Sequence, residues 1–151
     1  MRVARVPRGS DPLLKTLADF RFELRSFLHF SELAATEAGL QPQQHQLLLQ
    51  VAGAPEDAIV TIAYAAERLG LKHNSAVELV SRSEGEGLLM RTADATDKRR
   101  AILRLTRKGK LLLGRLADDH ARELNERAPR LAITLKNISK YSHKRAQMEP
   151  R

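Results

Sequence analysis

The middle of the sequence contains two short amphipathic segments with helical spacing, separated by only three residues. Their apolar positions recur at steps of one, three and four, and Gly70 lies in the connection between them. These positions are Ile62, Ala65, Ala66 and Leu69 in the first segment, and Ala76, Leu79 and Val80 in the second, over about 73–86. Thr61 precedes the first segment and is a favoured helix N-cap. Two short helices joined by a three-residue turn with glycine predict a helix-turn-helix.

Two short segments with strand character follow at once, after Gly87. Residues 88–92 and 101–105 are rich in apolar residues, and the polar residues 93–100 between them suit a hairpin loop. A helix-turn-helix followed by a β-hairpin is a winged helix. This order of elements identifies the fold more specifically than the helix-turn-helix or the hairpin alone. The sequence therefore predicts a mainly α fold with a small β-hairpin wing.

Helices are also predicted on both sides of this region. Residues 13–38 carry apolar side chains on two helical faces, and all four phenylalanines lie between positions 20 and 30. A domain of 151 residues cannot easily bury both faces, so a partner subunit is expected to cover one. A ligand pocket lined by Phe20, Phe27 and Phe30 is an alternative use of these rings. Plain packing is the simpler one.

Further helices are predicted around Pro42, over about 42–53, and after Thr106. The last pattern is expected to break at Pro129, with a final helix running to about residue 145. We therefore expect three regions. Residues 1–12 are poorly ordered, residues 13–38 and 107–145 form a helical dimerisation region, and residues 40–106 form the DNA-binding region. Residues 6–10 resemble part of a protease-cleavage sequence, and whether they are native stays open.

Charge and composition limit the classes of function. The chain has no cysteine, which removes disulfides, thiolate metal sites and thiol-based redox sensing. No apolar run approaches the roughly 20 residues of a membrane span, and no secretory signal is visible, so a soluble, cytoplasmic protein is expected. The net charge is +8. Residues 71–115 carry eleven Lys and Arg against five Asp and Glu, a basic band that suits nucleic acid or is simply a solvated face.

Four sequence blocks resemble the MarR family of bacterial transcription regulators, over about residues 13–140. They are LQPQQH at 40–45, AAERLG at 65–70, HNSAVELVSRSE at 73–84 and DKRRAILRLTRKG at 97–109. The resemblance implies a homodimer whose first and last two helices intertwine, with a winged helix-turn-helix in each lobe. It also implies repression through a palindromic operator, and in many members release by a small, often aromatic ligand.

The second helix of the predicted helix-turn-helix would read double-stranded DNA. Its candidate DNA-binding residues are His73, Asn74, Ser75, Val77, Glu78, Ser81 and Arg82. Asn74 can pair with adenine, Ser75 can donate or accept, and Val77 can touch a thymine methyl group. His73 and Arg82 suit phosphates. Glu78 needs a cytosine amino group or a pairing with Arg82. The alternative is an exposed, solvated helix face.

The predicted wing offers a second contact through Asp97, Lys98, Arg99 and Arg100. Asp97 and Arg99 resemble the family pair in which the carboxylate orients an arginine that enters the minor groove. Lys98 and Arg100 would contact phosphates. The alternative is an ordinary solvated turn with one surface ion pair.

Three positions depart from the family pattern. Gln41 is a weaker cap than the usual Thr or Ser, Ser83 stands where a core Leu is usual, and Gly85 replaces a better helix former. We therefore expect the recognition helix to fray near residues 83–85.

The function expected from the sequence is a homodimeric, ligand-responsive repressor that binds DNA sequence-specifically. An architectural or anti-repressor protein of the same fold is the alternative. An enzyme is disfavoured, because the sequence lacks HExxH, a glycine-rich phosphate loop and GxSxG. His120 and Glu123 have a spacing that metal ligands can have, but a solvated face is favoured. No cofactor or metal is expected, and the effector, the operator and the sign of regulation stay open.

Overall fold

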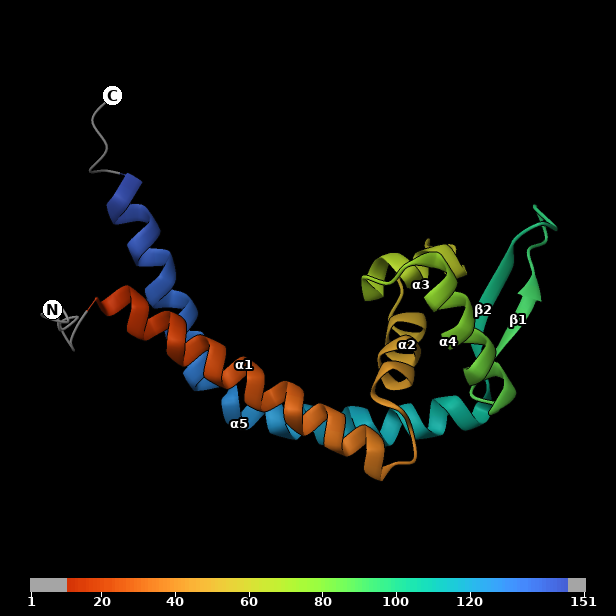
Figure 1. Cartoon of the computed structure of the whole chain (residues 1–151), viewed down its shortest axis with the longest axis horizontal. Helices are drawn as coiled ribbons and strands as arrows, with labels where there is room; N and C mark the ends of the chain where they lie inside the picture. Colours follow the sequence, from red (N-terminus) through yellow and green to blue (C-terminus); the bar gives the residue numbers. More distant parts are fainter. Residues whose placement is uncertain (1–10, 147–151) are drawn as a thin grey trace, which may run out of the picture. The chain divides into compact units, whose positions relative to one another are not determined.

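A computed structural model describes residues 11–146 of the chain, and these form five helices and one antiparallel hairpin (Figure 1). The helices are α1 (Pro12–Glu37), α2 (Pro42–Ala52), α3 (Ile62–Leu69), α4 (His73–Gly85) and α5 (Arg107–Ala146). The strands are β1 (Leu89–Ala93) and β2 (Ala101–Leu105). The predicted fold class, mainly α with a small β-hairpin wing, is confirmed.

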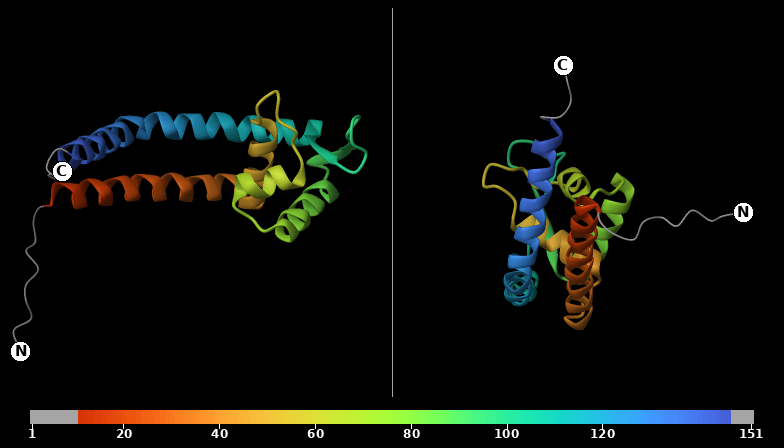
Figure 2. Two further views of the ribbon diagram at one scale, coloured as in Figure 1. Left: turned by 90° about the horizontal axis from the view of Figure 1, so that it is seen from above. Right: turned by 90° about the vertical axis from the view of Figure 1, so that its left-hand side faces the viewer.

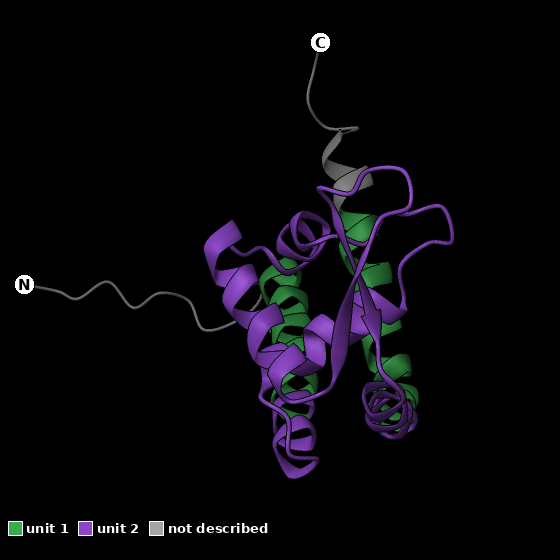
Figure 3. Cartoon of the chain, turned by 90° about the vertical axis from the view of Figure 1, so that its right-hand side faces the viewer, with its two compact units in different colours: residues 1–30, 121–151 green, residues 31–120 purple. Residues whose placement is uncertain are grey.

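The chain divides into two compact units (Figure 3). One comprises residues 31–120 and contains α2, α3, α4 and the hairpin. The other comprises residues 1–30 and 121–151, of which 11–30 and 121–146 are described. Helices α1 and α5 each contribute to both units. No helix among the described residues has the length and apolar character needed to cross a membrane.

The core of the 31–120 unit is built from the residues that the helical and strand periodicities mark as apolar. Leu47 and Leu48 of α2, Val80 of α4 and Leu103 of β2 are all within 2% of complete burial. Ala65 of α3 joins the same cluster. Each of these elements therefore turns one apolar face inward and leaves its opposite face to solvent.

Local sequence signals explain where α3 and α4 begin and end. The Thr61 hydroxyl accepts a hydrogen bond from the Tyr64 N–H at 3.2 Å, which caps α3 as expected. Gly70 ends α3 with a φ of +64°, a left-handed conformation that side chains other than glycine rarely adopt. The turn from α3 into α4 therefore depends on this glycine.

The hairpin is held to the rest of its unit at both ends. Leu89 pairs with Leu105, and Ala93 pairs with Ala101, so the loop between the strands spans residues 94–100. The Leu103 N–H donates to the Val60 carbonyl at 2.8 Å, which joins β2 to the segment before α3. Gly109 at the start of α5 lies so close to the Leu88 carbonyl that an added Cβ would stand 2.0 Å from that oxygen.

In the other unit, the first part of α1 and the last part of α5 lie side by side (Figure 2). They are joined by a cluster of charged side chains around the buried Glu23. Its carboxylate accepts from Arg127 Nη1 at 3.0 Å and from Arg130 Nε at 2.7 Å. Arg127 also donates to Glu123 at 2.6 Å, and both glutamates raise the Arg127 pKa above its ordinary value, the Glu123 hydrogen bond most strongly. The two helices are therefore locked by a buried carboxylate rather than by apolar packing alone.

The structure corrects two expectations about helix ends. Pro129 does not break the last helix, because α5 continues through it. Pro129 and Asn125 are both exposed, so the carbonyl that loses its helical partner can be hydrated. The expected disorder of residues 1–12 lies outside the described residues except at its end, where Pro12 is already the first residue of α1.

The expected fraying of the recognition helix near residues 83–85 is absent, because α4 runs through Gly85. Ser83 is completely buried, and its hydroxyl donates to the Leu79 carbonyl at 2.8 Å. The hydroxyl is thus satisfied within its own helix, so its burial leaves no polar group without a partner.

Candidate nucleic-acid interface

Helix α4 exposes the polar face that the sequence marked as the DNA-reading one. Ala76, Leu79 and Val80 are buried, and α3 packs against this helix. The exposed residues are His73, Asn74, Ser75, Glu78, Ser81 and Arg82, and Val77 is partly buried. Burial on one side thus fixes the rotation of α4 and determines which side chains remain available to a partner.

The last two exposed residues of this set are already used within the protein. Arg82 Nη1 donates to Gln41 Oε1 at 2.6 Å, which ties α4 to the start of α2. Arg91 Nη2 of β1 donates to the Ser81 hydroxyl at 2.7 Å. These bonds hold the helix against its neighbours. The pairing of Arg82 with Glu78 that the sequence suggested is not formed, and Arg82 bonds Gln41.

Arg91 and Glu84 also position α4, and the sequence reasoning missed both. Arg91 also forms an ion pair with Glu84, with Nε and Oε2 3.3 Å apart, and its backbone N–H donates to Glu84 Oε1 at 3.2 Å. Glu84 stands in the last turn of α4, so the helix and β1 are clamped together. Gln41 was noted only as a weak cap, yet its backbone N–H donates a hydrogen bond to Gln44 Oε1 at 2.9 Å.

The wing loop is organised around Asp94, which is nearly buried. One of its oxygens accepts from both the Thr96 backbone N–H and the Thr96 hydroxyl, each at 2.9 Å. The other lies 3.0 Å from Arg100 Nη2. The Thr96 backbone hydrogen bond is the main cause that lowers the pKa of Asp94, with the Arg100 charge adding to it. Asp94 was not among the predicted site residues, although its position at the start of the loop is typical of an Asx-turn.

Asp97 does not form the predicted pair with the Arg99 side chain. Asp97 Oδ1 accepts the backbone N–H of Arg99 at 3.0 Å, whereas the ion pair of Asp97 is with Arg100 Nε at 3.7 Å. Arg100 therefore bridges two carboxylates and stabilises the loop. Lys98 and Arg99 are exposed, and the described residues provide neither side chain with an ion pair.

The three phenylalanines of the predicted ligand pocket lie on α1. Phe20, Phe27 and Phe30 are each partly buried and belong to the unit of residues 11–30 and 121–146. They are seven and three residues apart, so their side chains share one side of the helix. The ligand pocket itself stays a prediction.

Two histidines with neighbouring rings lie in the 31–120 unit, His45 on α2 and His120 on α5. His45 is 2% exposed, and its ring centroid is 4.7 Å from that of His120. Burial, followed by the His120 charge, lowers the pKa of His45 to about 4. His120 Nδ1 donates to the Leu116 carbonyl at 2.6 Å, and its Nε2 lies 2.8 Å from the Ser31 hydroxyl. Both ring nitrogens of His120 are thus occupied.

The metal-ligand spacing noted for His120 and Glu123 does not lead to a metal site here. Glu123 is paired with Arg127, and His120 bonds Leu116 and Ser31. In the part of the chain from 11 to 146, no group of three or more His, Cys, Asp or Glu residues could hold a metal ion.

Two helices in helix-turn-helix order, followed by a hairpin with a basic loop, define this unit as a winged helix-turn-helix. Residues 38–100, which cover most of that unit, match the sequence model of the MarR family. Over these residues, which make up less than half of the chain, the winged helix-turn-helix is similar to that of the MarR family. No curated protein sequence matches it significantly.

Solved structures with the same fold include three that are informative. PcaV, a transcriptional regulator from Streptomyces coelicolor, is 25% identical, with 83% of this chain and 96% of PcaV covered and a TM-score of 0.56. CouR from Rhodococcus jostii RHA1, bound to p-coumaroyl-CoA, is 20% identical, with 83% and 87% covered and a TM-score of 0.63. A variant of MepR from Staphylococcus aureus, bound to an oligodeoxyribonucleotide, is 17% identical, with 86% and 95% covered and a TM-score of 0.62.

Proposed function

We propose that this protein is a transcription regulator that binds double-stranded DNA sequence-specifically through α4 and the wing. The observation that carries the proposal is the two-sided character of α4, whose apolar side is buried while Asn74, Ser75 and Glu78 face outward. No hydrogen bond within residues 11–146 occupies these three side chains, so their donors and acceptors are available to base edges. A variant of MepR, a protein of the same fold, has been solved bound to an oligodeoxyribonucleotide, which supports the proposal.

The residues at the two ends of α4 would then have different roles. Asn74, Ser75 and Val77 would read base edges in the major groove, and His73 would contact a phosphate. Arg82 has five N–H donors, of which Gln41 occupies one, so it can hold α4 in place and still reach a phosphate. Ser81, bonded to Arg91, would contribute to the placement of α4 more than to base reading.

The wing would supply a minor-groove contact. Arg99 is the residue we expect to enter the groove, because its guanidinium is exposed and unpaired within the described residues. Arg100 would hold the loop in shape through Asp94 and Asp97, and Lys98 would contact phosphate. This assignment keeps all four predicted residues but gives them different roles. Arg99 enters the minor groove, Lys98 contacts phosphate, and Asp97 and Arg100 stabilise the loop.

A homodimer is the assembly that the exposed apolar side chains favour. Leu14 and Phe22 of α1 are each 65% exposed in the single chain, and Ile133 and Leu135 of α5 are 60% and 52% exposed. A soluble protein rarely leaves so many large apolar side chains on neighbouring helices in water. We propose that residues 13–38 and 107–145 pair with a second copy, while residues 40–106 bind DNA. The two-fold symmetry would then match a palindromic operator with half-sites about one helical turn apart.

We further propose that the protein is a repressor released by a small ligand and acting in the cytoplasm, and that it is not an enzyme. CouR bound to p-coumaroyl-CoA is a protein of the same fold that binds an aromatic ligand. Phe20, Phe27 and Phe30 are the residues proposed to line such a pocket. An architectural or anti-repressor protein is the alternative, and a footprint of broad coverage instead of one palindrome would favour it.

The test is selection of bound DNA from a random pool, followed by titration of the selected site with matched variants. Arg99→Ala is expected to weaken binding and to narrow the preference for A·T-rich flanks, because it removes the minor-groove contact. Arg115→Ala is the matched control, since Arg115 is an exposed cation of α5 outside the winged helix. Equal affinities of the Arg99→Ala variant and the unchanged protein would refute the wing assignment. No enriched sequence from the pool would refute sequence-specific binding.

A further inference from the structure

A run of positive charge without acidic residues leads from the wing loop into the start of α5. Residues 98–117 contain eight Lys and Arg and no Asp or Glu. The wing cations at its beginning were described above. Beyond them, Arg104, Arg107 and Lys110 follow one another at intervals of three residues, and we call these three the basic strip.

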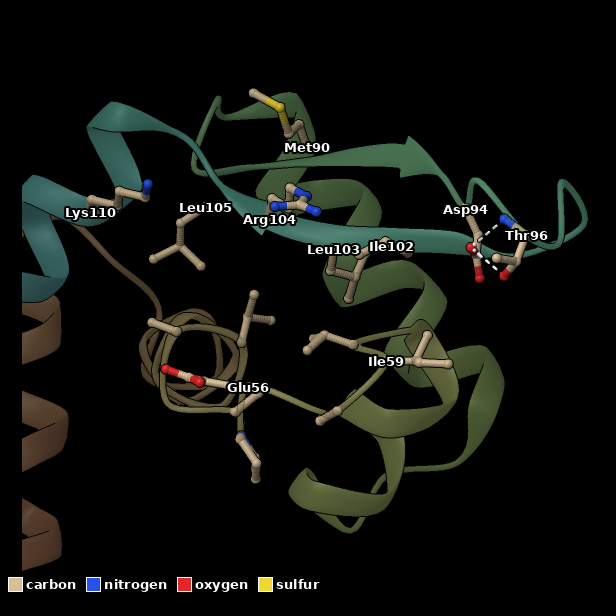
Figure 4. A pocket seen from close by; sticks show the side chains of 16 residues that line it. Glu56, Ile59, Met90, Asp94, Thr96, Ile102, Leu103, Arg104, Leu105 and Lys110 are labelled. Carbon is tan, nitrogen blue, oxygen red and sulfur yellow. Dashed lines mark hydrogen bonds between the residues drawn. The ribbon is translucent and has the colours of Figure 1, made fainter.

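The side chains of the basic strip point to solvent. The residues before and after Arg104 in β2 are buried leucines, so alternation along the strand places Arg104 on the solvent face of the hairpin, opposite Met90. Arg107 and Lys110 are exposed on the first turn of α5. Arg104 and Lys110 border the same cleft beside β2, so the strand and the helix carry their charges on adjoining surfaces (Figure 4).

The basic strip has no partner within residues 11–146. None of its three side chains forms an ion pair or a hydrogen bond there, whereas Arg91 and Arg100 of the same unit are paired with carboxylates. Glu56 also borders the cleft, but it is exposed and forms no ion pair. Like charges three residues apart on a helix repel each other, so an anionic partner of the strip would relieve this repulsion.

The start of α5 is fixed to the turn that follows α4. The Thr106 hydroxyl donates to the Gly87 carbonyl at 2.6 Å, and Lys108 Nζ donates to the Glu86 carbonyl at 2.8 Å. The basic strip is therefore held at a defined place relative to α4 and the hairpin. An anionic partner would meet charges that are already in position.

The hairpin separates Arg104 from α4. On its other face, Arg91 is bonded to Ser81 and Glu84 of α4. With α4 in the major groove and the wing loop in the next minor groove, the face that carries Arg104 points along the duplex, away from the recognised site. β2 leads from the wing loop to α5 (Figure 1), and at the rise of a strand Arg104 lies about 13 Å from Arg100. The strip thus faces the flank of the recognised site.

We propose that the basic strip binds the phosphate backbone of the double-stranded DNA that flanks the site read by α4 and the wing. The inference rests on the DNA-binding function proposed above and adds to it a contact that does not depend on sequence. It lengthens the stretch of duplex that the protein covers. The flank must lean toward the protein, and because DNA is stiff the net gain is smaller than the contacts alone would give.

The experiment compares a core duplex, which contains only the selected operator, with the same operator extended by unrelated sequence at both ends. Binding of the full chain is followed by fluorescence anisotropy at several salt concentrations. We expect the extended duplex to bind about tenfold more tightly. If two phosphates are neutralised at each end, the salt dependence should be steeper by about 2 per extended end. Changing the sequence of the flanks should leave this advantage intact, because phosphates carry no sequence information.

The Arg104→Gln/Arg107→Gln/Lys110→Gln variant should lose most of the advantage of the extended duplex. Its affinity for the core duplex should stay within about twofold of that of the unchanged protein, since charges beyond a Debye length are screened. Glu56→Gln should increase the advantage, because it removes the opposing charge. Arg115→Gln is the matched control, since it removes an exposed cation further along α5 and should keep the advantage. Thermal unfolding of each variant checks that it is folded.

Four results would overturn the proposal. They are equal affinity of the unchanged protein for the two duplexes, an advantage that survives the triple substitution, an equal loss of affinity for both duplexes in that variant, and a loss with Arg115→Gln as large as with the triple substitution. The first of these would favour an acidic protein as the partner of the basic strip. Binding to the core duplex without a flank effect refutes only the role of the strip, whereas binding to neither duplex refutes the DNA-binding function and the strip together.

Discussion

The buried carboxylate of Glu23 allows the stability of the α1–α5 pairing to be tested directly. Its side chain is 8% exposed and lies 3.0 Å from Arg127, whose side chain is 18% exposed. The second partner, Arg130, is 58% exposed, so solvent screens that pair and we assign it little free energy. The Glu23→Gln substitution keeps the size of the side chain but removes its charge. The cost should therefore come almost entirely from the Arg127 contact.

The size of the stability loss depends on the interactions that Arg127 retains after the substitution. Breaking a buried ion pair costs about 3–5 kcal/mol when the remaining charge is left alone. Here Arg127 retains Glu123 at 2.6 Å, and glutamine still offers an oxygen, so we expect a loss of about 2 kcal/mol. For a chain of this length, that loss lowers the melting temperature by about 4–8 °C.

The assay is calorimetric unfolding at a fixed protein concentration, because the proposed dimer would make the melting temperature depend on concentration. Asp19→Asn is the matched control. Asp19 pairs with Lys15 at 2.6 Å, but the two side chains are 52% and 77% exposed, so the expected change is below about 0.5 kcal/mol. If the two substitutions lower the melting temperature equally, burial does not set the strength of these ion pairs and the reasoning is refuted.

Three further predictions follow from the 31–120 unit. Gly109→Ala places a Cβ against the Leu88 carbonyl and should destabilise the protein by about 3 kcal/mol, the upper range for overpacking, in denaturant titration; an unchanged midpoint would contradict the close approach. His45 is held neutral by burial, so its pKa is about 4 in the folded protein against 6.5 unfolded, and stability present above pH 6.5 should be lost as the pH falls toward 4. The loss amounts to about 3 kcal/mol, and His45→Leu should flatten that part of the pH profile in unfolding measurements; a profile of unchanged slope would show that another group is responsible. Ser83→Leu inserts a larger side chain where the hydroxyl is already satisfied, and should lower the melting temperature; a higher one would indicate an underfilled core.

The DNA-binding proposal has a salt dependence that can be measured on the selected operator. If each subunit neutralises about four phosphates, the logarithm of the affinity should fall with the logarithm of the salt concentration at a slope of about −7. A slope near zero in gel-shift or anisotropy titrations would remove the electrostatic contribution of α4 and the wing.

Most elements of the fold could be predicted because their signals are local. The limits of α3 and α4 were predicted to within about a residue, from apolar residues at helical steps of three and four, the Thr61 cap and Gly70. The second strand of the hairpin was located at its observed limits, 101–105. Pro129 was misjudged because the same local rule was applied without knowing that the freed carbonyl faces solvent.

The candidate site was predicted less completely. Periodicity was sufficient to find the outward face of α4, since burial of Ala76, Leu79 and Val80 determines it. The partners of the charged residues could not be found in this way. Asp94 emerged as the centre of the wing loop, and Arg100 took the pairing expected for Arg99, because several arginines lie within reach and only their positions in space select one.

The sequence by itself determined the first four helices, the hairpin, the winged order and the apolar faces, since each depends on residues close together in the chain. Only the tertiary structure decided which distant side chains meet. Arg82 bonds Gln41 from 41 residues away, and Glu23 lies against Arg127 from more than 100. The physical reason is that hydrogen bonds and ion pairs act over a few ångströms, while many polar side chains in the sequence have the right chemistry. Folding selects one partner for each by bringing it within that distance.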